Sequence, residues 1–477
     1  MKTKIGLIIL VAGTLYAAAR ATTDTHYVDI NNATPSDPYT SRATAANDIQ
    51  SAIDAASPSD IVLVADGTYS ITEQIAISNC ITLRSENGSG SVTINANGNS
   101  RGIWITDLAG PFGMEGFTIT GGTHQNGGAL NIVALHDHAI HVADCVLEDS
   151  FATNNGGGMY IWVGAESSSS VLIERCEVRD NQAQNRGGGI WAGATATATG
   201  SITIQDCLID NNVSLKPGGG LNCFCFGDAP AATIKVDRCT ISNNTADKGG
   251  GARIGRNTTM ANSLVKYNTA HTGSSGGIYG GEPSSLTLNC TVVGNHTEHI
   301  GGGVSGCEVR NSIVYYNSAT GGDPDIYQTY PVLNTCAGNI TAGINGNINE
   351  PPEFLDPASG NYRLPVASPC VGAGSNSYVT AVLDLDRNKR IFGRVVDMGA
   401  YEGVYGCAIT NCVSASEGFI LEWVPCAETA AHVKWSPDLG ATSFTNLTAA
   451  LPFPQNSYTD TVHNADGQCF YRVDLQP

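Results

Sequence analysis

Six basic residues are concentrated in one stretch of an otherwise acidic chain, where only Asp237 and Asp247 oppose them. A lyase that cleaves an acidic polysaccharide needs a basic side chain to remove a sugar proton and cations to neutralise a uronate carboxylate. Stacked together, these residues could form a basic stripe with that chemistry. The alternative is a solvated face on which the Lys and Arg stems cover apolar surface. The candidates are, for catalysis, Lys248, Arg253 and Arg256 and, for ligand binding, Lys235, Arg238 and Lys266.

A histidine pair is the second candidate site. His136 and His138 are two residues apart, so both side chains would leave a strand on the same side and could bind a transition metal. His141 falls on the opposite face of such a strand, and no third ligand lies in register. The pair is therefore a metal-site hypothesis without a complete set of ligands.

Tryptophans form the third candidate site. Trp104, Trp162 and Trp191 are spaced so that we expect them on successive layers of a stacked structure. Trp162 and Trp191 could then form an aromatic platform for a sugar ring. Filling of the protein core is the alternative role for such large side chains.

These candidates lie in or beside an internal repeat that runs from about Phe117 to Asn317. Its first motif is Cys, any residue, an apolar residue, two further residues and Asn, with Ser263 and Ser312 replacing Cys in two copies. The motif supplies a ladder of structural residues: Cys145, Cys176, Cys207, Cys239, Cys290, Asn181, Asn212, Asn244, Asn268, Asn295 and Asn317.

The second motif is a pair or triplet of glycines followed by an apolar residue. The spacings between successive copies are 30, 31, 31, 31, 26 and 26 residues, which is too regular for chance and too variable for a coiled coil. The last glycine of each copy is Gly128, Gly158, Gly189, Gly220, Gly251, Gly277 or Gly303.

The repeats predict an all-β fold. Apolar residues two apart, such as Cys176 and Val178, occupy one face of a strand, and no helical stripe extends over three turns. A unit this short must stack on its neighbours to bury its apolar face. We therefore predict a right-handed parallel β-helix, similar to the pectin-lyase-like solenoids, with Cys, Ile and Val inside and Asn and Gly at the turns. The stacked cysteines are interpreted as buried thiols, with disulfides between neighbouring coils as the alternative.

The same motifs resemble the Gly-Gly-Ala-(Ile/Leu/Val) and Phe-x-x-Asn repeats of polymorphic outer-membrane proteins, a family of bacterial surface β-helices. Gly127-Gly128-Ala129-Leu130 is among the best matches, and the resemblance covers about residues 115 to 320. It implies a β-helix at the cell surface and implies little about activity. Because that family ends in a translocating barrel, for which the remaining chain is too short, we expect another route of secretion or attachment.

The flanking segments also resemble parts of bacterial surface β-helix proteins. Residues 22–58 are predicted to be an N-terminal cap, whose short helix carries Ile49, Ala52 and Ile53 and covers the first coil of a β-helix over residues 59–350.

Residues 351–405 resemble the choice-of-anchor Q-type segment that closes such proteins, through the stretches around Cys370 and from Asp384 to Glu402. The resemblance implies a terminal coil near the point of surface attachment. Asp384, Asp386 and Asn388 look like part of a Ca²⁺ site but lack a bidentate carboxylate partner. We interpret them mainly as a turn and predict no cofactor.

The two ends of the chain differ from the middle. Residues 1–21 have Lys2 and Lys4, an apolar run and a small-residue site, the order of a cleavable secretory signal. Residues 406–477 are predicted to be a small β-sandwich. Its four cysteines suggest one or two disulfides: Cys407, Cys412, Cys426 and Cys469.

Composition narrows the partners and the compartment. The formal net charge of −19 makes nucleic-acid binding implausible, and no later apolar run is long enough to span a bilayer. We therefore expect a secreted protein, extracellular or associated with the cell surface, including the outer membrane. Its partner would be a glycan or a surface or matrix protein.

Three functions remain open. The leading hypothesis is a structural, adhesive or glycan-binding β-helix, because the repeats contain no unique catalytic constellation. The second is a polysaccharide lyase or glycoside hydrolase acting on an acidic glycan. The Asn-Thr-Asp, Asp-Asp, Gly-His-Gly and Arg-Ile-Lys segments of galacturonan hydrolases are all absent from the chain. The third is a carbohydrate-binding protein without turnover.

Overall fold

A computed structural model gives the fold of most of the chain. It describes residues 23–227, 230–282, 284–328, 330–392 and 394–403, followed by 409–415, 418–423, 431–437, 444–449, 451, 457–463 and 469–475. The predicted secretory signal lies outside these ranges. Within them, no helix is both long enough and apolar enough to cross a membrane.

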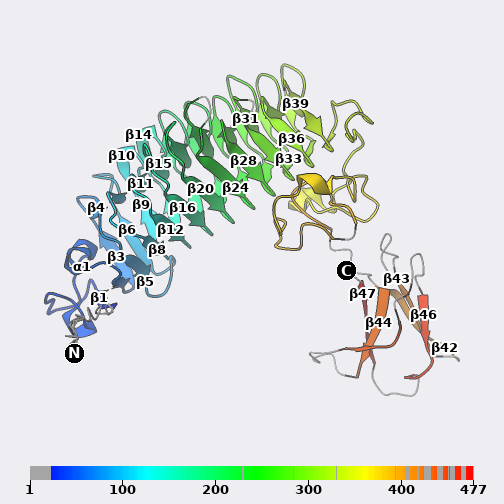
Figure 1. Ribbon diagram of the computed structural model, residues 1–477, viewed down its shortest axis with the longest axis horizontal. Coiled ribbons are helices and arrows are strands. Elements are labelled where there is room, and N and C mark those ends of the chain that lie inside the picture. The colour runs from blue at the N-terminus through cyan, green and yellow to red at the C-terminus, as the bar shows by residue number, and fades with distance from the viewer. Residues whose placement is uncertain are drawn as a thin grey trace, which may run out of the picture.

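Four parallel sheets form the walls of an elongated solenoid (Figure 1). The twelve-stranded wall contains β1 (Thr25–Val28), β2 (Ile61–Val64), β5 (Thr82–Ser85), β8 (Phe112–Glu115), β12 (Ala139–Ala143), β16 (Ser170–Glu174), β20 (Ser201–Gln205), β24 (Thr233–Asp237), β28 (Thr258–Ala261), β32 (Leu286–Leu288), β36 (Glu308–Arg310) and β40 (Val332–Leu333). The eleven-stranded wall contains β3 (Gly67–Ser70), β6 (Val92–Asn95), β9 (Thr118–Thr120), β13 (Val146–Glu148), β17 (Glu177–Arg179), β21 (Leu208–Asp210), β25 (Thr240–Ser242), β29 (Leu264–Lys266), β33 (Thr291–Val293), β37 (Ile313–Tyr315) and β41 (Cys336–Ala337).

The other two walls complete each coil. The eight-stranded wall contains β10 (Thr123–Asn126), β14 (Phe151–Asn155), β18 (Gln182–Ala183), β22 (Val213–Ser214), β26 (Thr245–Ala246), β30 (Thr269–Ala270), β34 (His296–Thr297) and β38 (Ser318–Ala319). The ten-stranded wall contains β4 (Ile75–Ile77), β7 (Ile103–Thr106), β11 (Leu130–Ala134), β15 (Met159–Val163), β19 (Ile190–Ala194), β23 (Leu221–Cys225), β27 (Ala252–Ile254), β31 (Ile278–Gly280), β35 (Val304–Ser305) and β39 (Ile326–Tyr327).

Neighbouring strands within each wall come from successive coils, so the chain visits the walls in turn before it pairs with itself. Parallel strands joined by such crossovers follow a right-handed path. The architecture confirms the all-β, right-handed parallel β-helix that the repeats predict.

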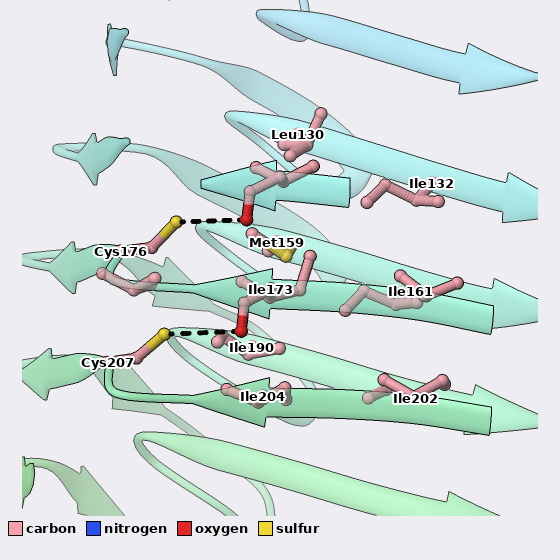
Figure 2. Close-up of a cluster of buried hydrophobic side chains, with 14 of the residues drawn as sticks. Leu130, Ile132, Met159, Ile161, Ile173, Cys176, Ile190, Ile202, Ile204 and Cys207 are labelled. Atoms are coloured by element: carbon pink, nitrogen blue, oxygen red, sulfur yellow. Dashed lines mark hydrogen bonds between the residues drawn. The ribbon is translucent and has the colours of Figure 1, made fainter. Parts of the chain in front are cut away.

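The core lies between the walls and is built from stacked aliphatic side chains. Figure 2 shows Ile161 of β15 and Ile190 of β19 on one side, facing Ile173 of β16 and Ile204 of β20. All four side chains are fully buried. One row per strand points inward because alternate residues of a strand face opposite sides.

The repeated cysteines stack at the edge of this core. The Cys176 thiol donates to the carbonyl of Val142, and the Cys207 thiol donates to that of Ile173, each at 3.8 Å (Figure 2). Every described cysteine is a free thiol, so no disulfide links the coils in the described part of the chain. These thiols fill space as small, nearly apolar groups.

The repeated asparagines form a continuous buried hydrogen-bonded row. The Asn181 amide donates to the side-chain oxygen of Asn212 at 3.1 Å, and Asn212 donates to Asn244 at 3.0 Å. The row continues through Asn268, Asn295 and Asn317 and ends on the carboxylate of Asp325 at 3.0 Å. The amide of Asn212, for example, also donates to the carbonyls of Asp210 in its own coil and Val178 in the preceding coil, so it satisfies backbone groups of both.

A short helix lies at the N-terminal end of the solenoid (Figure 1). Helix α1 (Ile49–Ala55) begins after Asp48, whose carboxylate accepts the backbone N–H of Ser51 at 2.8 Å. It buries Ile49, Ala52 and Ile53 against the first strands, after the 3-10 turn η1 (Arg42–Thr44). The predicted capping helix is confirmed.

Residues 351–403 pack against the outer side of the eleven-stranded wall, and include the 3-10 turns η2 (Pro357–Ser359) and η3 (Asn376–Tyr378). Three side chains of that wall point outward and are covered by this segment: Leu264, Val293 and Ile313. The covering side chains are Phe354, Tyr362, Leu364, Met398 and Tyr401. Within the described residues, this segment adds no strand to the four walls.

The C-terminal residues form two small antiparallel sheets. One contains β42 (Ile409–Ala415), β43 (Gly418–Trp423) and β46 (Ser457–Asp460), and the other contains β44 (Ala431–Ser436), β45 (Thr445–Asn446) and β47 (Phe470–Leu475). This agrees with the small β-sandwich expected from the sequence. Cys412 and Cys469 are free thiols, and Cys407 and Cys426 lie outside the described residues.

Candidate functional site

The ten-stranded wall carries an outward row of large and polar side chains. From β15 to β35, each member of the row is the second residue after a run of glycines. The first residue after the glycines points into the core, so the second must point outward. In strand register, the row consists of Trp104, Asn131, Tyr160, Trp191, Asn222, Arg253, Tyr279, Ser305 and Tyr327.

Five aromatic side chains touch one another on this face. Tyr160 stacks on Trp191 with ring centroids 4.6 Å apart, and Trp191 stacks on Trp162 at 5.8 Å. Phe226 meets Trp162 edge-on at 5.7 Å and Phe224 at 4.9 Å. These five residues, Tyr160, Trp162, Trp191, Phe224 and Phe226, are called the aromatic strip below.

Glycines let two rings of the strip lie flat against the wall. A Cβ atom at Gly193 would lie 2.4 Å from the Trp191 ring, and one at Gly255 would lie 2.1 Å from the Phe224 ring. Trp191 is consequently only 5% exposed and forms the floor of the strip. Phe226, at 40% exposure, and the half-buried Trp162 present the accessible apolar surface.

The structure corrects the expected spacing of the tryptophans. Trp162 and Trp191 lie on adjacent coils, but Trp104 is two coils before Trp162 because β11 intervenes. Trp104 contacts the guanidinium of Arg101, with a distance of 5.9 Å to the ring centroid. It lies outside the aromatic strip.

Arg253 extends the aromatic strip toward the C-terminal end of the wall. Its guanidinium carbon lies 4.8 Å from the centroid of the Phe224 ring. No other described residue forms a hydrogen bond or ion pair with this guanidinium. Burial lowers the pKa of Arg253, and the nearby charge of Arg186 lowers it further.

Three more cations lie beside this end of the strip. Arg186, Lys216 and Lys248 each precede the glycine run of successive coils, and backbone hydrogen bonds link these turns. Burial raises the pKa of Asp247, and the positive charges of these three residues oppose that rise. The result is a local basic patch on an acidic protein.

A groove adjoins Arg253 at the same end of the wall. It has a volume of about 290 Å³ and is lined in part by Gly281. A Cβ atom at Gly281 would lie 3.5 Å from Arg253 Nη2. The Lys248 ammonium lies 5.7 Å from the centroid of the Tyr279 ring. The other principal lining side chains are Ser305, Tyr327, Gln328 and Tyr330.

The six basic residues of the predicted stripe do not lie on one face. Lys235 is in register with Thr259 of the next coil, so the stretch from Lys235 to Lys266 passes fully around the solenoid and on to the next wall. Lys235 lies on β24 of the twelve-stranded wall, Arg253 lies on the ten-stranded wall and Lys266 lies on the eleven-stranded wall. Of the six, Lys248 lines the groove described above, and Arg253 lies beside Gly281 at its edge.

The remaining four have other contacts. Lys235 pairs with Asp237 at 3.2 Å, and Arg238 forms two 2.9 Å contacts with Asp206. Arg256 lies 3.3 Å from Glu282, and the Lys266 ammonium lies 5.9 Å from the ring centroid of Tyr362 in the covering segment. These four basic side chains therefore interact with other side chains of the protein.

The two histidines lie in a turn and not on a strand, because β11 ends at Ala134 and β12 begins at Ala139. Their ring centroids are 6.3 Å apart, and His136 Nε2 lies 3.0 Å from the Asp107 carboxylate. No group of three His, Cys, Asp or Glu side chains suited to a metal is present in the described residues.

The Ca²⁺-like stretch is occupied by internal contacts. Asp384 accepts the backbone N–H groups of Asn388 and Glu402, both at 2.7 Å, and Asp386 pairs with Arg363 at 2.5 Å. Two of the oxygen-bearing side chains are thus already engaged by hydrogen-bond donors. The interpretation as a turn fits these contacts.

Several residues of this face were missed by sequence reasoning, among them Phe224, Phe226, Tyr160, Arg186 and Lys216. A signal was present, because Tyr160 and Tyr279 occupy the same place after the glycine run as Trp191 and Arg253. Aligning the copies on their glycines, and not on linear proximity, groups these residues correctly.

Comparisons with known proteins identify no family for this chain. No family model matches it, and no curated protein matches it. The resemblances to polymorphic outer-membrane repeats and to the choice-of-anchor segment therefore stay predictions. Among solved structures, the crystal structure of pectate lyase Pel9A is similar, with a TM-score of 0.47 and 14% sequence identity, over 80% of this chain and 97% of that one.

Proposed function

We propose that this protein is an exported β-helix that binds a glycan along the aromatic strip and does not cleave it. The observation that carries the proposal is the contact chain from Trp162 through Phe226 and Phe224, which ends under Arg253. Sugar rings have apolar faces that pack on aromatic side chains, and the polar groups of such a site fix their orientation.

The regular wall supports a binding role. Its strands repeat about every 4.8 Å, so a long polymer can contact equivalent positions on successive coils. Next to the strip, the half-exposed Tyr279 repeats this outward position with a hydroxyl group, whereas Asn222 and Ser305 are buried and bonded within the wall. Adhesion to a glycan-coated surface or matrix would use the same face.

A lyase is the second candidate, because Lys248 and Arg253 lie at the same groove. Lys248 would act as the base that removes a proton, and Arg253 would neutralise a uronate carboxylate. The described lining of the groove contains no His, Asp or Glu to act as an alternative base. Because Lys248 is then the base that a lyase would need, its substitution separates cleavage from binding.

The test is to measure binding of purified protein to immobilised neutral and acidic polysaccharides, while recording unsaturated-uronate absorbance and reducing ends in the same samples. We expect Trp162→Ala and Phe226→Ala each to weaken binding by about tenfold, because each removes a stacking surface. No product should form. The matched control is Trp104→Ala, which removes the same side chain from the same wall outside the strip and should leave binding unchanged.

Two results would contradict the proposal. Equal binding by the wild type and both strip variants would remove the aromatic strip from the binding site. Product formation that is lost in Lys248→Ala would make the protein a lyase.

A further inference from the structure

We infer that the glycan bound by this protein is anionic and that Arg253 is the residue that anchors its negative group. The inference rests on the proposed function and names the chemical class of the ligand. It comes from Arg253 and its surroundings, which the aromatic strip alone does not explain.

Arg253 differs from arginines elsewhere on the solenoid that are held by a carboxylate. Arg175 forms a bidentate pair with Asp144 at 2.8 and 2.7 Å, and Arg310 pairs with Glu308 at 2.6 Å. Arg253 contacts the Phe224 ring and forms no ion pair within the described part of the chain; Glu282 attracts it electrostatically but pairs with Arg256 at 3.3 Å. A partly buried cation without a counter-ion in direct contact carries an unrecovered desolvation cost, which a bound anion offsets.

The space beside Arg253 is open to a ligand. Gly281 has no side chain to cover the guanidinium, and the groove begins there. Phe224 holds one face of the guanidinium, so its N–H edge remains available for the two-pronged contact that carboxylate and sulfate oxygens accept. A ligand that stacks on Trp162 and Phe226 would thus meet a cation as it continues along the wall.

The cations beside Arg253 favour an anion at this place. Arg186, Lys216 and Lys248 lie on successive coils beside Arg253, whereas the whole chain has a formal net charge of −19. The protein would repel a polyanion over most of its surface and attract it here. Selectivity therefore comes from a local site and not from overall charge.

The chemistry at Arg253 suits a uronate carboxylate and a sulfate ester alike. The experiment measures binding of the full secreted chain to polygalacturonate and to its methyl-esterified form, and to dextran sulfate and unmodified dextran. We expect the wild type to bind at least one anionic polymer about tenfold more tightly than its uncharged counterpart. The preferred pair of polymers identifies the anionic group.

Variants separate the anion site at Arg253 from glycan binding on the aromatic strip. Arg253→Ala should abolish the preference for the anionic form and leave binding of the uncharged form unchanged, whereas Trp162→Ala should weaken both. Arg253→Lys keeps the charge but loses the fork, and should retain only part of the preference. Arg84→Ala removes an exposed arginine from the twelve-stranded wall and should change nothing.

The outcomes are distinguishable. Trp162-dependent binding that shows no preference for the anionic form would overturn this inference and leave the proposed function standing. A preference that persists in folded Arg253→Ala, checked by its thermal midpoint, would remove Arg253 from the anion site. Binding of none of the four polymers would overturn both.

Discussion

The buried asparagines are the residues on which the stacking of coils depends most directly. The Asn212 side chain donates to the carbonyls of Val178 at 2.8 Å and Asp210 at 3.0 Å, and its oxygen accepts from Asn181. It has no exposed surface, so water cannot replace these bonds. Removing the side chain leaves several buried groups on two coils unpaired.

We therefore expect Asn212→Ala to lower the free energy of unfolding by about 3 kcal/mol, since each unpaired buried group costs about 1–3 kcal/mol. Urea unfolding measures the change. Gln184→Ala, an exposed amide removed from a neighbouring turn, should shift stability by less than about 0.5 kcal/mol and serves as the control. Equal effects of the two substitutions would show that the row contributes nothing specific.

Single residues also mark the limit of prediction from sequence. The repeated Cys and Asn positions can be found because each recurs in step with the glycines. Aligning the copies on their glycines puts Phe224 on the coil before Arg253, but it does not show that the two side chains meet. A residue's charge is visible in the sequence, but the absence of its counter-ion depends on what the neighbouring coil places beside it.

The glycine runs act at the scale of the coil. Between the eight-stranded and ten-stranded walls the chain turns sharply, and neighbouring turns pack backbone to backbone. A Cβ atom at Gly188 would lie 2.4 Å from the Val213 carbonyl oxygen and 2.5 Å from that of Gly219. These are backbone atoms of the next coil, which cannot rotate out of the way.

Gly188→Ala should consequently destabilise the protein by about 3 kcal/mol through forced separation of two coils. Gly90→Ala is the matched control, because a Cβ there would meet nothing within 4 Å. That change should alter stability by less than about 1 kcal/mol. Thermal unfolding of the two variants, side by side, measures the difference, and a well-tolerated Gly188→Ala would mean that the coils can separate at little cost.

Element order explains both the success and the error of the sequence-based predictions. The glycine period defines the coil, so the β-helix and its walls follow from the sequence. Linear proximity, by contrast, groups Lys235 with Arg253, although β24 and β27 belong to different walls. In a solenoid, residues one full period apart are neighbours, and residues a few apart face different directions.

The segment that covers the eleven-stranded wall is a property of the whole molecule. Its contacts join residues very distant in the chain, such as the backbone N–H of Ala400 and the hydroxyl of Thr291 at 3.0 Å. The outward Leu264, Val293 and Ile313 are apolar where many equivalent positions are polar, which marks a face that needs covering but does not show what covers it. The position of the segment on this wall could not be predicted from the sequence.

This segment buries several charges together, and that gives it a pH dependence. Arg390 is 1% exposed and lies 3.7 Å from the Glu402 carboxylate, while Asp384 and Asp397 are buried nearby. Burial and the neighbouring Asp397 raise the pKa of Glu402 to about 8, against the opposing effect of Arg390. Glu402 therefore holds its proton in the folded protein at pH values where the unfolded chain has lost it.

The sign of the effect follows from proton linkage. Between the ordinary glutamate pKa of about 4.3 and the folded value of about 8, the unfolded chain binds fewer protons, so the contribution of Glu402 to stability falls as pH rises. We expect protection of the Met398 amide, which donates to the Cys370 carbonyl at 3.0 Å, to decrease over this range in hydrogen exchange corrected for intrinsic rates. Glu402→Gln should flatten that decrease, because its side chain cannot ionise. Glu298→Gln, at an exposed carboxylate beside His271, should leave the decrease unchanged. An identical pH profile in wild type and Glu402→Gln would mean that Glu402 is already ionised in the folded protein and that Arg390, not burial, dominates its environment.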